Sequence, residues 1–517
     1  MNLSRRSVAW RLFLTCWFVY VLHFATDFAR EHYLVVTMVD QHTFRLDPYL
    51  GWHADIFRNP PEAKEPGVHH GANPGISLLA AIPYAVTRPA IELINREVVK
   101  RQGPVDTTGG YNDPRPNRVK FFKLARAAGV DIKFGLVGAV TMALCMAPLT
   151  AASAVAMFAL LGRLGLSQRL SLALALTYAF GTPVFFRTAY LNQNLGIAVF
   201  AFLAFLLLWD PGHRSRLGLR PRYLLAGASG GFCFLADYSG ALALGLLGLY
   251  GWLRRRDDAG WGQGLKDSSW YALGAAPMIL ALWFYQWQAF GHPFLPPQHW
   301  MPPEQAYSNL GAYKGVGVPQ LDLLLRLLVD PSYGLFIAGP IFLLALGAPW
   351  LFRRGTSVVP VRETVFCFVF TAAFVIFFSA ISYTRLQWVT GIRYLAPVFP
   401  FLFLPVAAVL VRLPRWIACG AVILSVTVVW CQAMVRGQKT VLSDVTRVFL
   451  EGFQLPWLTV LGKTASAYAP WLERPSPLPL FTLWAVLIAA IWLVRQPGAP
   501  LAGEAGVPGG PGTKLEE

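Results

Sequence analysis

Charged residues are scarce in this chain. Asp, Glu, Lys and Arg together make up 14% of its 517 residues, whereas 55% are hydrophobic and the mean hydropathy is +0.47. A soluble protein of this size with so few charges would disperse poorly in water, but a protein embedded in a bilayer would not. The sequence also lacks the GxGxxG, P-loop and HExxH motifs, so a soluble nucleotide-binding enzyme or a zinc protease gains no support.

Cysteine is rare as well. All six cysteines lie in apolar blocks, and none has the spacing of a metal site: Cys16, Cys145, Cys233, Cys367, Cys419 and Cys431. We therefore expect small buried core residues rather than a disulfide framework.

Arginine, in contrast, is abundant and unevenly placed. The net charge is +17, and arginine clusters fall on every second connection between apolar blocks: Arg163/Arg169, Arg214/Arg216/Arg220/Arg222, Arg254/Arg255/Arg256, Arg353/Arg354 and Arg412/Arg415. This alternation is the positive-inside pattern of a multi-span membrane protein. It explains the charge better than nucleic-acid binding does, because no basic and aromatic groove pattern accompanies it. We expect a multi-pass protein of the cell inner (plasma) membrane, with a cytoplasmic N-terminus and no nucleic-acid partner.

The apolar blocks predict about twelve membrane-spanning helices of roughly 20 residues each. They centre near residues 18, 147, 178, 201, 230, 246, 279, 343, 373, 402, 425 and 486. The predicted fold class is therefore an all-α integral membrane protein, with one polytopic domain over residues 1–495. The stretch 496–517 is rich in Gly, Pro and Ala and is predicted to be a disordered cytoplasmic tail.

Three long connections are assigned to the external face: 29–131, 289–332 and 435–477. Within the first, the block Ile76–Ile94 is broken by two prolines, and polar residues in and just after it follow one helical stripe: Ser77, Tyr84, Arg88, Glu92 and Asn95. Such a stripe is typical of an amphipathic helix that lies on the membrane surface. The first external loop is thus expected to carry interfacial helices.

The external loops hold most of the residues that could do chemistry. The acidic candidates are Asp27, Glu31, Asp40, Asp47 and Asp55. Asp27 ranks first, because an anion at the C-terminus of the first helix meets the negative end of the helix dipole. Interfacial acids are functional candidates, although an aspartate there can also simply mark the water boundary. Asp40 is the second candidate in the same loop.

Other polar residues at external positions are candidate ligand contacts. His69 and His70 could touch a phosphate or, with a third ligand, a metal, although Asn73 and Pro74 after them also form an ordinary helix start. Arginines at the outer surface could clamp a phosphate or anchor the chain at the interface. The remaining candidates are Asp237, Tyr238, Arg326, Tyr333, Arg393 and Tyr394.

The order of several short motifs resembles the GT-C superfamily of integral-membrane glycosyltransferases. The similarity is to the bacterial relatives of dolichyl-phosphate-mannose–protein mannosyltransferases and aminoarabinose transferases, and it covers roughly residues 10–435. Asp27-Phe28-Ala29-Arg30-Glu31 is similar to the family's first-loop motif, and Asn73-Pro74-Gly75 to its Pro-Gly motif before a surface helix. Weaker similarities are Phe180-Gly181-Thr182-Pro183, Phe290-Gly291-His292-Pro293-Phe294, Tyr333-Gly334-Leu335-Phe336 and Gly391-Ile392-Arg393-Tyr394-Leu395.

This resemblance implies inverting transfer of a hexosyl or pentosyl group from a polyprenyl-phosphate carrier to a lipid, glycan or protein acceptor on the external face. Asp27 or Asp40 would be the catalytic base, since the acceptor hydroxyl must lose a proton. Arg30 and the other polar candidates would bind substrate, because a phosphate leaving group needs cations. Membrane lipids are further partners. No cofactor is implied, and a divalent metal is left open.

Two rival functions do not involve glycosyl transfer. One is a polytopic lipid or saccharide transporter or flippase, for which acids near mid-membrane are expected. The other is a non-catalytic assembly subunit.

Overall fold

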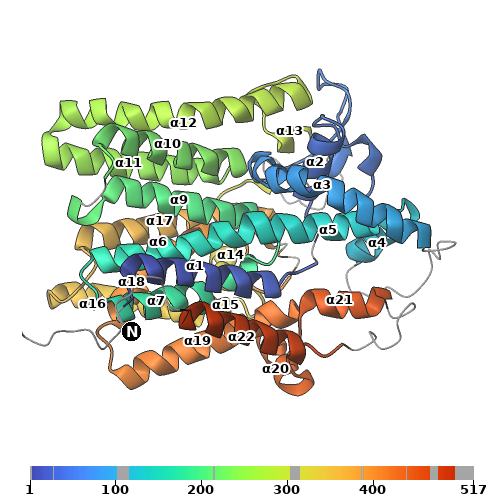
Figure 1. The fold of residues 1–517 in the computed structure, drawn as a ribbon. Helices are drawn as coiled ribbons and strands as arrows, with labels where there is room; N and C mark the ends of the chain where they lie inside the picture. Colours follow the sequence, from blue (N-terminus) through green and yellow to red (C-terminus); the bar gives the residue numbers. More distant parts are fainter. Residues whose placement is uncertain are drawn as a thin grey trace, which may run out of the picture.

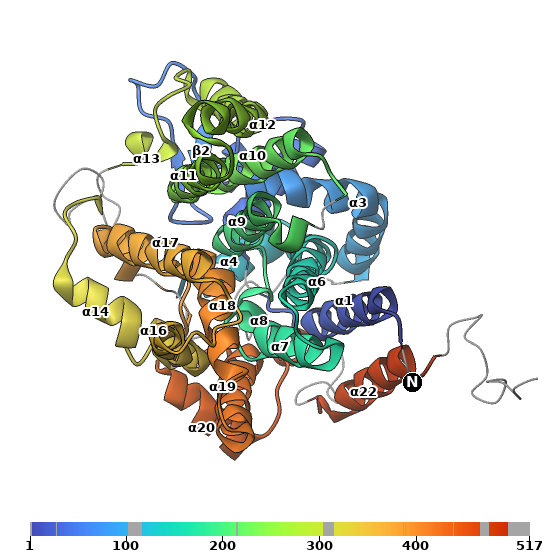
Figure 2. The same cartoon turned by 90° about the vertical axis from the view of Figure 1, so that its left-hand side faces the viewer.

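Long helices that run roughly parallel form a bundle, and short helices and loops gather at one end of it (Figure 1). The computed structural model describes residues 3–26, 28–101, 116–213, 216–302, 315–385, 387, 389–437, 439–465 and 475–494. In the end-on view, α9 and α18 lie near the middle of the bundle (Figure 2), and all twelve residues of α18 are buried. The core therefore sits between the helices, as expected for an all-α fold.

The elements of the first half are α1 (Arg5–Leu22), α2 (Glu31–Asp40), η1 (Asp47–Tyr49), β1 (Ile56–Arg58), β2 (Val68–His70), α3 (Gly75–Arg101), α4 (Pro116–Ala127), α5 (Asp131–Thr141), η2 (Met142–Met146), α6 (Ala147–Arg163), α7 (Gln168–Phe180), α8 (Val184–Arg187), α9 (Gln193–Trp209), η3 (Pro211–His213), α10 (Leu219–Ala236) and α11 (Gly240–Ala259). The second half contains α12 (Trp261–Phe290), α13 (Pro297–Trp300), α14 (Leu321–Val329), α15 (Leu335–Ala338), η5 (Pro340–Gly347), α16 (Ala348–Arg353), α17 (Val361–Ser379), η6 (Ser382–Arg385), η7 (Ala396–Val398), α18 (Phe399–Leu410), α19 (Arg415–Val435), α20 (Val441–Glu451), α21 (Pro456–Ala465) and α22 (Leu478–Leu493).

Each predicted span centre falls inside one of these helices. Among the described residues, four helical stretches are both long and apolar enough to cross a membrane: Gly75–Lys100, Asp131–Arg163, Val361–Ser379 and Arg415–Val435. Shorter apolar helices include Gln193–Trp209, Pro340–Arg353, Ala396–Leu410 and Leu478–Leu493. These apolar helices indicate a membrane-embedded protein, whereas the number of crossings stays a prediction.

The arginine clusters share one end of the bundle. The ends of α6, α11, α16 and α18, which carry or adjoin four of the five clusters, lie at the left in Figure 1 on the same side as the N-terminus. Buried carboxylates form ion pairs with arginines there and so join the helices. Arg222 pairs with Asp210 at 2.7 Å, and Arg254 pairs with Glu363 at 2.9 Å. The arginines thus hold the bundle together in addition to patterning its connections.

Glycine brings α10 and α12 into backbone contact. A Cβ on Gly227 would lie 1.9 Å from the carbonyl oxygen of Tyr271, and one on Gly274 would lie 2.0 Å from that of Leu224. Small residues at such crossings let membrane helices approach closely. The sequence around Gly227 reads Gly-Ala-Ser-Gly-Gly, which matches the GxSxG pattern of hydrolases. Ser229 nevertheless sits inside α10 and donates to the carbonyl of Leu225 at 2.9 Å, so the motif serves helix packing.

The polar stripe of α3 faces the protein rather than water. Ser77 donates to the carbonyl of Glu31 at 3.0 Å, and Asn95 donates to the carbonyl of Gly129 at 3.0 Å. The opposite face is apolar and exposed, with Val86 at 77%. The stripe thus joins α3 to α2 and α5, and a position of this helix on the membrane surface stays a prediction.

Asp40, our second candidate for the catalytic base, lies at the centre of these polar contacts between α2, α3 and α5. Its carboxylate forms ion pairs with Arg88 at 2.8 Å and Lys133 at 2.7 Å, and it accepts a hydrogen bond from Tyr84. Lys133 also pairs with Glu92 at 2.5 Å. Asp40 therefore joins α2, α3 and α5 and has a structural role.

The first and last described helices lie side by side at the edge of the bundle (Figure 2). Arg11 on α1 donates to the carbonyls of Trp492 and Val494 at the end of α22. Trp484 on α22 donates to the carbonyl of Phe18 at 2.7 Å. All six cysteines are free. Five of them are buried as expected, whereas Cys419 on α19 is exposed.

Replacing Asp40 tests the structural role. Asp40→Asn should lower the free energy of unfolding by about 3 kcal/mol, because it leaves a largely buried Lys133 poorly compensated. Asp47→Asn is the matched control, since its ion pair with Arg45 is exposed on both sides and should contribute less than about 1 kcal/mol. Thermal unfolding of the purified protein measures both. Equal stability of the two variants would contradict the assignment.

Candidate functional site

A cavity of about 580 Å³ opens at the end of the bundle opposite the arginine clusters. Segments far apart in the sequence line it. They are the connection between α1 and α2 with the start of α2, residues 52–55, α4, residues 190–194 at the start of α9, Ser332 and Tyr333, and Arg385, Gln387, Val389, Thr390 and Arg393. Its charged lining residues are Arg30, Arg118, Arg385, Arg393, Glu31 and Asp55. Cations therefore outnumber acids among the described lining residues.

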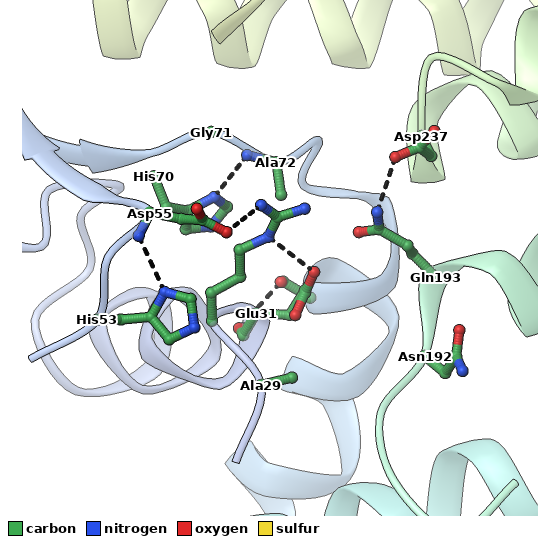
Figure 3. A network of polar contacts seen from close by, with 12 residues as sticks. Ala29, Glu31, His53, Asp55, His70, Gly71, Ala72, Asn192, Gln193 and Asp237 are labelled. Carbon is green, nitrogen blue, oxygen red and sulfur yellow. Dashed lines mark hydrogen bonds and ion pairs between the residues drawn. The ribbon is translucent and has the colours of Figure 1, made fainter. Parts of the chain in front are cut away.

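The carboxylates of Glu31 and Asp55 lie close together (Figure 3), and Arg30 forms an ion pair with each of them. Its guanidinium pairs with Asp55 at 2.5 Å and with Glu31 at 3.3 Å. Burial of the Glu31 carboxyl acts to raise its pKa, but Arg30, the backbone, His70 and Arg393 together outweigh burial and lower the pKa. Glu31 is therefore an anion at neutral pH, and it is held by a cation.

His53 is a neutral hydrogen-bond donor in the same wall. Its Nδ1 accepts from the backbone N–H of Asp55 at 3.0 Å, which places the ring proton on Nε2. Burial is the main cause that lowers the pKa of His53, so the ring stays uncharged at neutral pH.

Arg393 is presented by a tightly constrained turn. Its backbone N–H donates to the side chain of Gln387 at 3.1 Å, and the N–H of Gly391 donates to the carbonyl of Ser332 at 2.7 Å. Gly391 has φ of +92°, and a Cβ there would lie 2.5 Å from the ring of Phe186, so glycine is required. The Arg393 guanidinium lies 5.0 Å from the ring centroid of Tyr394. Among the described residues, no carboxylate pairs with Arg393.

Two further arginines complete the basic lining. Arg385 pairs with Asp322 on α14 at 2.8 Å and donates to Gln320 at 3.0 Å. Arg118 on α4 donates to the backbone carbonyl of Thr26 at 3.1 Å.

Three of the predicted ligand contacts line the cavity, namely Arg30, Tyr333 and Arg393. Tyr394 and Asp237 do not line the cavity but contact residues that do. The ring of Tyr394 lies under the guanidinium of Arg393. Asp237 accepts a hydrogen bond from the side chain of Gln193 at 2.7 Å. The proposed base Asp27 lies outside the described residues, although Thr26 and Phe28 on either side of it line the cavity.

The other predicted contacts are elsewhere. His69 and His70 are buried in β2, where they pair in register with Phe57 and Ile56 of β1. Tyr238 accepts from Gln286. Arg326 is exposed on α14 and lies 3.6 Å from Asp330. These four side chains and Asp40 are absent from the cavity lining, because each is committed to packing or to a local partner.

The sequence did not predict several lining residues: His53, Arg118, Tyr190, Asn192, Gln193, Asn194, Arg385 and Gln387. One signal was available. Asn192-Gln193-Asn194 is a run of three amides directly before an apolar block, and Asn192 does cap α9 by accepting from the N–H groups of Asn194 and Leu195. Arg118 and Arg385 reach the cavity only through tertiary contacts and carry no local pattern.

A metal site does not emerge from the geometry. Within the described ranges, no group of three or more His, Cys, Asp or Glu side chains could hold a metal ion.

Buried histidines beside the cavity predict a pH dependence of stability. Burial lowers the pKa of His69 to about 4 and of His70 to about 3, against about 6.5 in an unfolded chain. Because the unfolded chain binds more protons between these values, stability is complete above about pH 6.5 and is lost as the pH falls toward 4. Melting temperatures measured from about pH 7 to 4.5 should decline. His70→Gln should flatten the slope, whereas His42→Asn at an exposed position should not. A slope unchanged by His70→Gln would refute this account.

Comparison of the chain with protein-family models, with curated proteins and with solved structures gave no match.

Proposed function

We propose that this protein is a membrane glycosyltransferase that moves a sugar from a polyprenyl-phosphate carrier to an acceptor at the external face. The carrying observation is the cavity at the bundle end opposite the arginine clusters, in which Arg30, Arg118, Arg385 and Arg393 converge. A mobile lipid-linked anion could reach such a site from the bilayer. The resemblance of the ordered motifs to the GT-C superfamily supports the same function.

The arginines suit a phosphate leaving group. When the bond between the anomeric carbon and the phosphate oxygen breaks, the electron pair stays on the phosphate and its negative charge grows. Fixed guanidinium groups stabilise that growing charge without donating a proton. Arg393 is the best placed of them, because no described carboxylate forms an ion pair with it and the turn around Gly391 holds its backbone.

The acceptor needs a carboxylate base. Its hydroxyl oxygen attacks the anomeric carbon from the face opposite the phosphate, which inverts the centre, while its proton passes to the base. Glu31 and Asp55 both pair with Arg30, and Arg30 helps to lower the pKa of Glu31. Asp27 therefore remains our proposed base, with Thr26 and Phe28 as its neighbours at the cavity.

A phosphate-binding role for Arg393 predicts a graded loss of donor affinity. Arg393→Ala should weaken binding of a polyprenyl-phosphate sugar about 10- to 100-fold, in line with the loss of a charge-assisted pair. Arg393→Lys should restore only part of it, because the bidentate fork is lost. Arg326→Ala is the matched control, since Arg326 is exposed away from the cavity. Equal donor affinity in the Arg393→Ala and Arg326→Ala proteins would remove the phosphate assignment.

The proposed role of Asp27 as the base predicts that Asp27→Asn loses transfer activity but still binds the donor. Transfer should fall roughly 100- to 10,000-fold, the usual effect of removing a general base, while donor affinity and thermal stability stay near those of the parent. The assay is transfer of radiolabel in nanodiscs from a panel of polyprenyl-phosphate sugars. Normal turnover of the variant would move the base to Glu31 or Asp55. Movement of label across the membrane without any transfer product would favour the transporter alternative.

A further inference from the structure

The end of α9 that meets the cavity presents neutral polar groups rather than charges. Tyr190, Asn192, Gln193 and Asn194 all line the cavity. Hydrogen bonds to other protein groups fix the orientation of these side chains. The donors and acceptors that remain available to a ligand in the cavity follow from those bonds.

Gln193 is held with its amide carbonyl available. Its Nε2 donates to Oδ2 of Asp237 at 2.7 Å, and Asp237 also accepts from the N–H of Ser239 through Oδ1 at 2.9 Å. Because an ionised carboxylate only accepts, the amide must point its nitrogen at Asp237. Its Oε1 is buried and has no hydrogen-bond partner within the described protein. Figure 3 shows this oxygen directed away from Asp237, toward the side on which Glu31 lies.

Tyr190 and Asn194 add two donors. The Tyr190 hydroxyl accepts from Arg187 at 3.1 Å and from Asn192 at 3.2 Å. Since both contacts use its oxygen as an acceptor, its own proton is left to donate. The Nδ2 of Asn194 is buried, with only 1% of the residue exposed, and it also has no partner within the described protein. Unpaired buried groups of this kind are costly unless a ligand meets them.

We propose that this segment, Tyr190 with Asn192–Asn194, is the subsite for the neutral hydroxyl groups of the transferred sugar. One amide acceptor and two neutral donors match hydroxyl groups, each of which both donates and accepts. The arginines of the same cavity take the phosphate, so the charged and the neutral groups each bind a different part of the donor. This subsite rests on the proposed function, and Asp237 serves it as a positioning residue behind Gln193.

The test compares a lipid phosphate with two sugar esters of the same lipid phosphate. Farnesyl phosphate and its mannosyl and arabinosyl esters are titrated into the whole chain in nanodiscs. Gln193→Ala should weaken binding of the sugar esters about 5- to 10-fold, the effect of one neutral hydrogen bond, and leave affinity for farnesyl phosphate unchanged. Asp237→Asn should act in the same direction but less, because the Gln193 amide can then turn either way.

Gln168→Ala is the matched control, because Gln168 also begins a helix, α7, but does not line the cavity. An equal loss of affinity for both ligands in Gln193→Ala, or no loss for either, would overturn the subsite while leaving the proposed function standing. Failure of the parent protein to bind either ligand would overturn the proposed function, and the subsite with it.

Discussion

Polar groups in this protein must find partners inside it, because the apolar surface faces outward. The clearest instance is the seam at which α3 meets α2 and α5. There the stripe from Ser77 to Asn95 pairs inward around Asp40 and Lys133, and apolar residues such as Val86 are left outside. In water the reverse arrangement would be favoured, so the seam reflects a lipid-facing environment. The walls of the cavity formed by α2 and α4 are attached to the bundle through this seam, since α5 continues into α6.

The arginines of this protein occupy two kinds of environment. At the opposite end of the bundle, Arg222 and Arg254 meet buried carboxylates and become fixed parts of the packing. In the cavity, Arg393 has no such partner among the described residues, and Arg30 is only balanced by Glu31 and Asp55. An anion that enters would supply the missing partner. The neutral groups at the start of α9 line the same cavity, so it offers both cations and uncharged hydrogen-bonding groups.

Much of the fold could be predicted from the sequence, because the length of an apolar run depends only on residues that are neighbours in the chain. Every predicted span centre lies in a helix, and the alternation of arginine clusters does mark a common end. The candidate site was harder to predict. Arg393 and Arg30 stand in recognisable local motifs, whereas Arg118 and Arg385 reach the cavity through long-range packing. Asp40 could not be told from a catalytic acid, since its partners Arg88 and Lys133 lie 48 and 93 residues away.

The pairing of α1 with α22 has a consequence for biogenesis. Residue 478, the start of α22, is made 456 residues after Leu22, the end of α1. At about 5–20 residues per second, that separation corresponds to roughly 20–90 seconds of translation. Throughout this interval, Arg11 has not yet met the carbonyls of Trp492 and Val494. The contacts of Arg11 with α22 can therefore form only after most of the chain has been made.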